Sequence, residues 1–177
     1  MKEGGFVKRY IYGMSVTRSF LLGKMEGYSE VIQEHILKIV TAHQTGNAKY
    51  IDKWIGDTSR AVYNVSKYTI GNKNKRLSAE AYEKFLLDSI FGNSEQDMKS
   101  SLEDFKQYYP EYSNFVIDED LTKVLFNIVK DLRQLIPSMI AEHTDSEGIP
   151  IPRIHNKLRS LIHKYIDFDS GEDNWRK

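Results

Sequence analysis

The feature that most constrains the fold is a long stripe of apolar residues at helical spacing. Large aliphatic side chains recur every three or four positions, which places them along one side of a helix. Such a face has to be buried against other elements. Asp118 stands where an N-cap is expected, and Pro137 predicts a kink or a break. The stripe consists of Leu121, Val124, Leu125, Ile128, Val129, Leu132, Leu135, Ile136, Met139 and Ile140.

Two further apolar stripes precede it and predict two more helices. One consists of Ile51, Trp54, Ile55, Thr58, Val62 and Val65, widened by Tyr50, Ala61 and Tyr68. Asn47 is a candidate N-cap for that helix. The other consists of Val31, Ile32, Ile36, Ile39 and Val40. It either continues backwards through Gly23 and Gly27, or breaks near Gly27 with Ser29 as a new N-cap.

Helix ends are marked by three Gly-Asn pairs, at Gly46, Gly71 and Gly92. Ser78 is expected to begin a helix through Phe91, and Ser94 with Asp97 resembles a capping box that opens a helix ending before Pro110. A loop over residues 144–152 leads to a last helix over residues 154–166. We therefore predict an all-α, single-domain bundle of six or seven mostly antiparallel helices over residues 15–166. Residues 1–14 are expected to be extended, and residues 167–177 to form a flexible polar tail.

The composition excludes several classes of function. Twenty-five basic and 25 acidic residues give a formal net charge of zero. This argues against a positive electrostatic field over the whole chain that would attract nucleic acid. The absence of cysteine removes disulfides, thiol catalysis and cysteine-ligated metals, and it fits a reducing compartment. Neither an apolar signal-peptide core nor a membrane-length apolar run occurs. We expect a cytoplasmic protein that does not enter a membrane.

The alternative that the chain is an enzyme depends on its histidines. His35, His43 and His143 fall within apolar helical arcs, and their convergence would create an acid–base or metal site. The spacings of histidine–carboxylate metal motifs are absent, and so are phosphate-binding glycine loops and nucleophile elbows. We therefore predict no catalytic residue, no metal and no cofactor. The alternative interpretation is that the histidines form no site. It places His43, His143 and His163 in the last turns of their helices.

The last helix is basic, with four full positive charges, two histidines and no acid between Arg153 and Lys164. Gly148, Ile154, Leu158 and Leu161 make this stretch resemble the turn and recognition helix of a helix-turn-helix or winged-helix module. The resemblance implies a nucleic-acid-binding regulator, with exposed side chains that include His155 reading the nucleic acid. The alternative is a closing helix whose cations surround its apolar stripe. The candidate nucleic-acid-binding residues are Arg153, Asn156, Lys157, Arg159 and Lys164.

Residues 95–120, called the acidic segment below, contain eight acids and two bases, a local charge of −6. Tyrosines interleaved with acids are typical of protein interfaces, although the same residues also suit a partly buried loop. The candidate partner-binding residues are Tyr108, Tyr109, Tyr112 and, in the tail, Trp175. We predict a non-enzymatic interaction protein that masks or recruits a protein partner, as inhibitors, immunity-type proteins and adaptors do. A homo-oligomer is compatible with the sequence.

Overall fold

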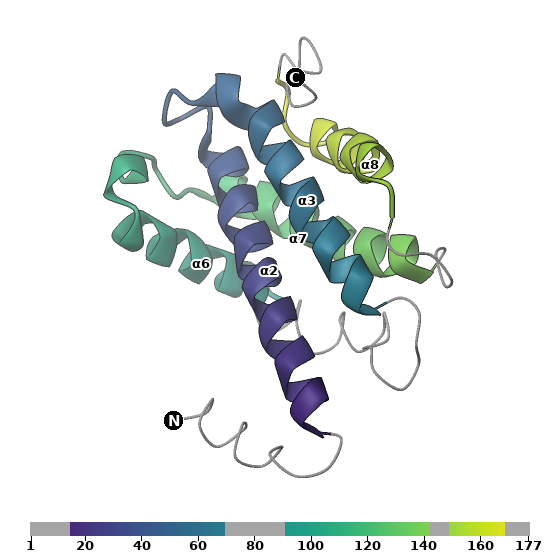
Figure 1. The fold of residues 1–177 in the computed structure, drawn as a ribbon. Coiled ribbons are helices and arrows are strands. Elements are labelled where there is room, and N and C mark those ends of the chain that lie inside the picture. The colour runs from purple at the N-terminus through teal and green to yellow at the C-terminus, as the bar shows by residue number, and fades with distance from the viewer. Residues whose placement is uncertain (1–14, 70–90, 142–148, 169–177) are drawn as a thin grey trace.

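A computed structural model describes residues 15–69, 91–141 and 149–168 (Figure 1). This part contains five α-helices and two short 3-10 helices, and it contains no strand. The α-helices are α2 (Ser15–Thr41), α3 (Ile51–Thr69), α6 (Glu95–Tyr108), α7 (Glu119–Ala141) and α8 (Ile151–His163), and the 3-10 helices are η1 (Ala48–Tyr50) and η3 (Pro110–Tyr112). The predicted all-α class is confirmed.

Helices α2 and α3 form the centre of the arrangement. They lie side by side and antiparallel, joined by a short turn, while α8 packs on α3 and α6 packs on α7 (Figure 1). Helix α2 runs without interruption through Gly23 and Gly27, so the stripe continues backwards and the alternative of a break with Ser29 as an N-cap is wrong. Ser29 is instead fully buried within the helix. Burial of the following turns stabilises the helix by more than two glycines destabilise it.

The buried faces follow the apolar stripes closely. All six principal stripe residues of α3 are buried, and so are all stripe residues of α7 except the half-buried Val124 and Leu135. Val31 and Tyr50 are exposed, so their assignment to the core-facing stripes is wrong. Helix α7 continues through Pro137, so no break occurs there. The buried Ile136 and Met139 on either side of the proline hold both parts of the helix in the same core.

Two helices begin with the capping residues that the sequence predicts. Gly92 has a φ of +72°, and a Cβ at this position would lie 2.5 Å from the Asp97 side chain, so only glycine fits. The Ser94 Oγ accepts a hydrogen bond from the Asp97 N–H at 3.1 Å, and the Asp97 carboxylate accepts one from the Ser94 N–H at 3.1 Å. This reciprocal capping box begins α6. At α7, the Asp118 Oδ1 accepts a hydrogen bond from the Leu121 N–H at 2.8 Å.

Two predicted boundaries need correction. Asn47 precedes η1, and its side chain makes no capping hydrogen bond; its amide donates backwards to Thr45 Oγ1 at 3.2 Å. Helix α8 begins at Ile151, so Pro152 lies in its first turn and not in a loop. Proline is tolerated there because the first N–H groups of a helix have no intrahelical acceptor.

Some expectations fall outside the described residues. These are the extended segment 1–14, the end signal at Gly71, most of the helix predicted from Ser78, the loop residues 142–148 and the tail from residue 169 onwards. The last described residue, Phe168, is buried, and its ring stacks on His163 with centroids 4.1 Å apart. The packed structure therefore reaches Phe168.

Candidate functional site

Helix α8 closes the fold by packing on α3. Ile154, Leu158 and Ile162 are buried, and the Arg159 Nε lies 3.5 Å from Asp52 Oδ1 at the start of α3. Both members of this ion pair are largely shielded from water. His155, expected to be exposed for base contacts, has 0% of its surface exposed, and that expectation is wrong. It lies next to the buried Ile154 and one turn before Arg159.

The five candidate nucleic-acid-binding residues divide by environment. Arg153 and Asn156 are exposed, and Lys157 is half-buried. Arg159 is paired with Asp52, and the Lys164 Nζ donates a hydrogen bond to Asp131 Oδ2 at 2.8 Å. The hydrogen bond to Asp131 raises the pKa of Lys164. Arg159 on this helix and Lys164 directly after it are therefore directed at carboxylates of the same chain.

Asp131 joins α7 to the end of α8. It accepts hydrogen bonds from Lys164 Nζ and, at 2.7 Å, from the Tyr165 hydroxyl. Partial burial opposes ionisation of Asp131, but these two hydrogen bonds outweigh it, so the pKa of Asp131 lies below its ordinary value. The hydrogen bond to Asp131 also raises the pKa of Tyr165.

The acidic segment comprises α6, η3, the following turn and the start of α7. Seven of its eight acids are exposed, and Asp97, the capping residue, is partly shielded. Tyr108, at the end of α6, is 73% exposed. This segment of the chain therefore presents both exposed acids and an exposed aromatic ring.

Tyr109 and Tyr112, two other candidate partner-binding residues, turn towards the core. The Tyr109 hydroxyl donates a hydrogen bond to Glu34 Oε1 at 2.7 Å. This hydrogen bond and partial burial raise the pKa of Tyr109 to about 12. Burial opposes ionisation of Glu34, but hydrogen bonds from Lys38 and Tyr109 lower its pKa overall. Tyr112 packs against the ring of Trp54 at 6.3 Å and that of Phe105 at 5.4 Å.

Val116 was not among the predicted partner-binding residues, yet it is 64% exposed. Its backbone is held on both sides by Gln44, whose Oε1 accepts from the Val116 N–H at 2.7 Å and whose amide donates to the Val116 carbonyl at 3.3 Å. Phe115 is buried before it and Ile117 half-buried after it. This alternation of burial is typical of extended backbone, but the run from Phe115 to Ile117 is apolar throughout, so the sequence carries no signal that singles out Val116. Trp175, the remaining candidate, lies outside the described residues.

The described histidines have separate local partners. His35 places its Nδ1 2.8 Å from the Val31 carbonyl and its Nε2 3.4 Å from Asp57 Oδ2. The His43 Nε2 lies 2.8 Å from the Asp167 carbonyl oxygen. His143 lies outside the described residues, so convergence of all three is untested. Within the described ranges, no three histidine, aspartate or glutamate side chains are grouped to hold a metal ion.

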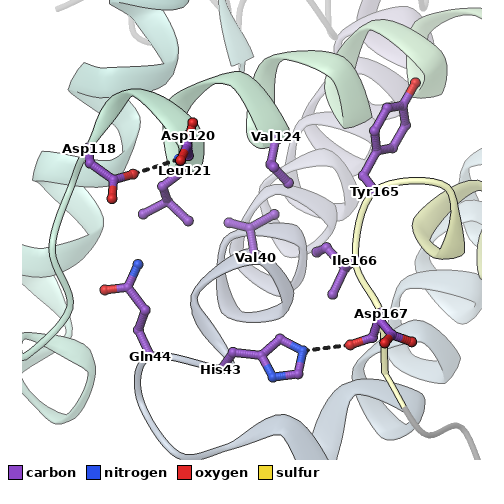
Figure 2. A pocket seen from close by; sticks show the side chains of 10 residues that line it. All are labelled: Val40, His43, Gln44, Asp118, Asp120, Leu121, Val124, Tyr165, Ile166 and Asp167. Carbon is purple, nitrogen blue, oxygen red and sulfur yellow. Dashed lines mark hydrogen bonds between the residues drawn. The ribbon is translucent and has the colours of Figure 1, made fainter.

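A pocket of about 390 Å³ lies between the end of α2, the start of α7 and the residues that follow α8 (Figure 2). Val40, Leu121, Val124 and Ile166 face its interior. Its polar margin consists of Asp118, Asp120, His43, Gln44, Tyr165 and Asp167. The hydrogen bond between His43 and Asp167 forms one side, and the Asp118 cap of α7 forms the opposite side (Figure 2).

No protein-family model, no curated protein and no solved structure matches this chain. None of the helices in the described part combines the length and apolar content needed to cross a bilayer. The function is therefore inferred from the chemistry of the surfaces described above.

Proposed function

We propose that this chain is a non-enzymatic interaction protein that binds a basic surface of a protein partner through its acidic segment. The observation that carries the proposal is the presentation of Tyr108 and Val116. Both are strongly exposed apolar side chains, and they lie eight positions apart in the most acidic stretch of the chain. Aromatic anchors surrounded by charge are the arrangement that protein interfaces use.

Hydrogen bonds fix the backbone around these two side chains to the rest of the fold. Gln44 holds Val116 through two hydrogen bonds, and the Lys106 Nζ donates to the Phe115 carbonyl at 2.7 Å. Phe115 itself is buried against the ring of Phe105. A segment fixed in this way loses little conformational entropy when a partner binds, which favours affinity. The surrounding acids would accelerate encounter with a positively charged partner.

The direct test is capture of a partner from the native host with the purified chain and with a Tyr108→Ala/Val116→Ser variant. We expect the wild-type chain to retain a specific protein and the variant to lose it, with affinity reduced at least about tenfold. A matched control is Tyr50→Ala/Val31→Ser, which removes the same two residue types from exposed positions outside the acidic segment. This control should retain the partner.

Two outcomes would contradict the proposal. One is equal capture by the wild-type chain and the Tyr108→Ala/Val116→Ser variant. The other is loss of capture only when Arg153, Asn156 and Lys157 are changed to alanine, which would favour the nucleic-acid-binding alternative at α8. In that case duplex binding should weaken steeply with salt. Masking of an enzyme, as by an inhibitor or immunity-type protein, and recruitment by an adaptor are both forms of the proposed role.

We further propose a cytoplasmic location and a single bundle of six or seven helices for the whole chain. The lack of cysteine supports a reducing compartment. Five helices in the described part, with central helices that pack antiparallel, support the bundle. Protease protection of the full chain, mapped by mass spectrometry, would test whether residues 70–90 contribute a further helix.

A further inference from the structure

We infer that the pocket between α2, α7 and the residues after α8 receives a lysine or arginine side chain of the partner. This inference rests on the proposed function, because it assigns one subsite of the same interface. The acidic segment ends at Asp120, so the pocket margin continues directly from the segment that carries Tyr108 and Val116. A partner seated on the acidic segment would therefore reach the pocket without a second contact surface.

The interior of the pocket fits the aliphatic stem of a long cationic side chain. Val40, Leu121, Val124 and Ile166 supply apolar walls around about 390 Å³, which exceeds the volume of one side chain (Figure 2). Lysine and arginine bury their methylene groups along apolar surface and keep the charged group at the edge. An entirely apolar side chain would fill the same walls but would leave the acids at the margin without a counter-charge.

The margin of the pocket attracts a cation from two sides. Asp120 lies on the α7 side and Asp167 on the opposite side, and both are exposed (Figure 2). Among the described residues, no cationic side chain forms an ion pair with either carboxylate or with Asp118. A charged group placed between two carboxylates makes charge-assisted hydrogen bonds, which are stronger than neutral ones.

An anionic occupant is disfavoured by the negative charge at the α7 N-terminus. The Leu121 N–H donates to Asp118 Oδ1, and the Thr122 N–H donates to the Asp118 carbonyl at 3.1 Å. The Leu121 N–H, which an anion at this helix end would use, is therefore already occupied by Asp118. Three consecutive acids, Asp118, Glu119 and Asp120, also oppose negative charge at this helix end.

The test is an NMR titration of the full chain with four capped amino acids. The probes are the Nα-acetyl-N-methylamides of arginine, lysine, norleucine and glutamine. We expect saturable shifts of the Gln44, Leu121, Val124 and Asp167 amides with arginine or lysine, at dissociation constants of about 1–10 mM. Comparison of the two cations shows which one the pocket prefers. Norleucine, which keeps the stem without the charge, should bind at least about tenfold more weakly.

The matched variants are Asp120→Asn/Asp167→Asn in the pocket and Glu103→Gln/Asp104→Asn on α6. Both remove two negative charges, but only the first pair should weaken arginine or lysine binding, by about tenfold. The inference is overturned if neither cation gives saturable shifts, if norleucine binds equally well, or if both variants weaken binding alike. It is also overturned if the same amides shift on raising the protein concentration alone, because the occupant is then a second copy.

The two proposals fail in distinguishable ways. If the Asp120→Asn/Asp167→Asn variant captures the partner as strongly as the wild-type chain, the pocket inference is wrong and the interaction surface stands. If cations bind in the pocket but the Tyr108→Ala/Val116→Ser variant still captures the partner, the proposed interaction surface is wrong. In that case the pocket alone holds the basic side chain.

Discussion

The acidic segment concentrates negative charge in the sequence and helix α8 concentrates positive charge. In the structure, the charges of these two regions have different roles. Four acids of the acidic segment, Glu103, Asp104, Glu111 and Glu119, are exposed. On α8, Arg159 reaches Asp52 of α3, and the adjoining Lys164 reaches Asp131 of α7. A cluster of like charge in the sequence is therefore either a surface available for binding or a set of ties between helices.

The difference follows from where each element sits. Helix α8 covers α3, so a long cation on its margin lies within reach of carboxylates on the helices below it. The acidic segment passes around the end of α6, and one of its two bases, Lys106, donates a hydrogen bond to a backbone carbonyl. Carboxylates on such an exposed turn are available to cationic groups of an external partner. The four predictions below test this division.

The largest effect is expected from Arg159→Met. Asp52 is 7% exposed, and loss of the Arg159 guanidinium would remove a positive charge beside this shielded carboxylate, so the free energy of unfolding should fall by about 2–3 kcal/mol. Urea denaturation measures this loss. Combining the change with Asp52→Asn should recover part of it, as a double-mutant cycle would show. Lys157→Met on the same helix should change stability by less than about 0.5 kcal/mol. Equal losses at Arg159 and Lys157 would remove the structural role assigned to the cations of α8.

The Tyr109→Phe variant tests whether the inward-facing Tyr109 stabilises the fold while the exposed Tyr108 does not. Removing the hydrogen bond to Glu34 should lower the free energy of unfolding by about 1 kcal/mol, while Tyr108→Phe should have no measurable effect. The lowered pKa of Glu34 means that the wild-type advantage is lost as the pH falls through the native pKa of Glu34. The pKa of Tyr109, raised to about 12, means that the advantage is also lost as the pH rises from 10 through 12. Denaturation curves across this range measure both limits, and a pH-independent difference would contradict the hydrogen-bond assignment.

Asp97→Asn tests the one acid of the acidic segment that is used as a helix cap. Hydrogen bonds from the Asn93 N–H and from Ser94 lower the pKa of Asp97, so its ionised form stabilises the fold above the ordinary pKa of an aspartate. We expect the melting temperature at neutral pH to fall by about 2 °C. The difference from wild type should close as the pH falls through the native pKa of Asp97. Asp104→Asn on the same helix is the control, and an equal effect there would show that the capping box adds nothing.

The smallest effect on stability is expected from Glu103→Gln/Glu111→Gln. Both side chains are exposed, so the free energy of unfolding should change by less than about 0.5 kcal/mol. The same variant should slow association with a captured partner and reduce the salt dependence of the association rate, measured by surface plasmon resonance. A clear loss of stability would mean that these acids are structural, and the contrast with α8 would disappear.

The periodic stripes predict the buried faces of α3 and α7 well because burial of a helix side depends mainly on local spacing. The capping box at Ser94 and the cap at Asp118 are likewise local, so both were predictable. The roles of Asp52, Glu34 and His155 were not. Each depends on which helix lies opposite, and the pairing of Asp52 with Arg159 joins positions 107 residues apart.

The candidate interface shows the same limit. Tyr108 and Tyr109 are adjacent in the sequence, and composition alone assigns both to a binding surface. Adjacent positions on a helix point in different directions, so one ring faces solvent and the other reaches Glu34. Val116 escaped prediction because its exposure results from the hold of Gln44 on its backbone, a contact between distant segments.

The tie between Asp52 and Arg159 has a consequence for biosynthesis. While the ribosome is still adding residues before position 151, α3 lacks the cover that Ile154, Leu158 and Ile162 supply, and Asp52 lacks its guanidinium. The nascent chain therefore cannot complete its core until α8 has left the exit tunnel. Until then one side of α3 stays uncovered.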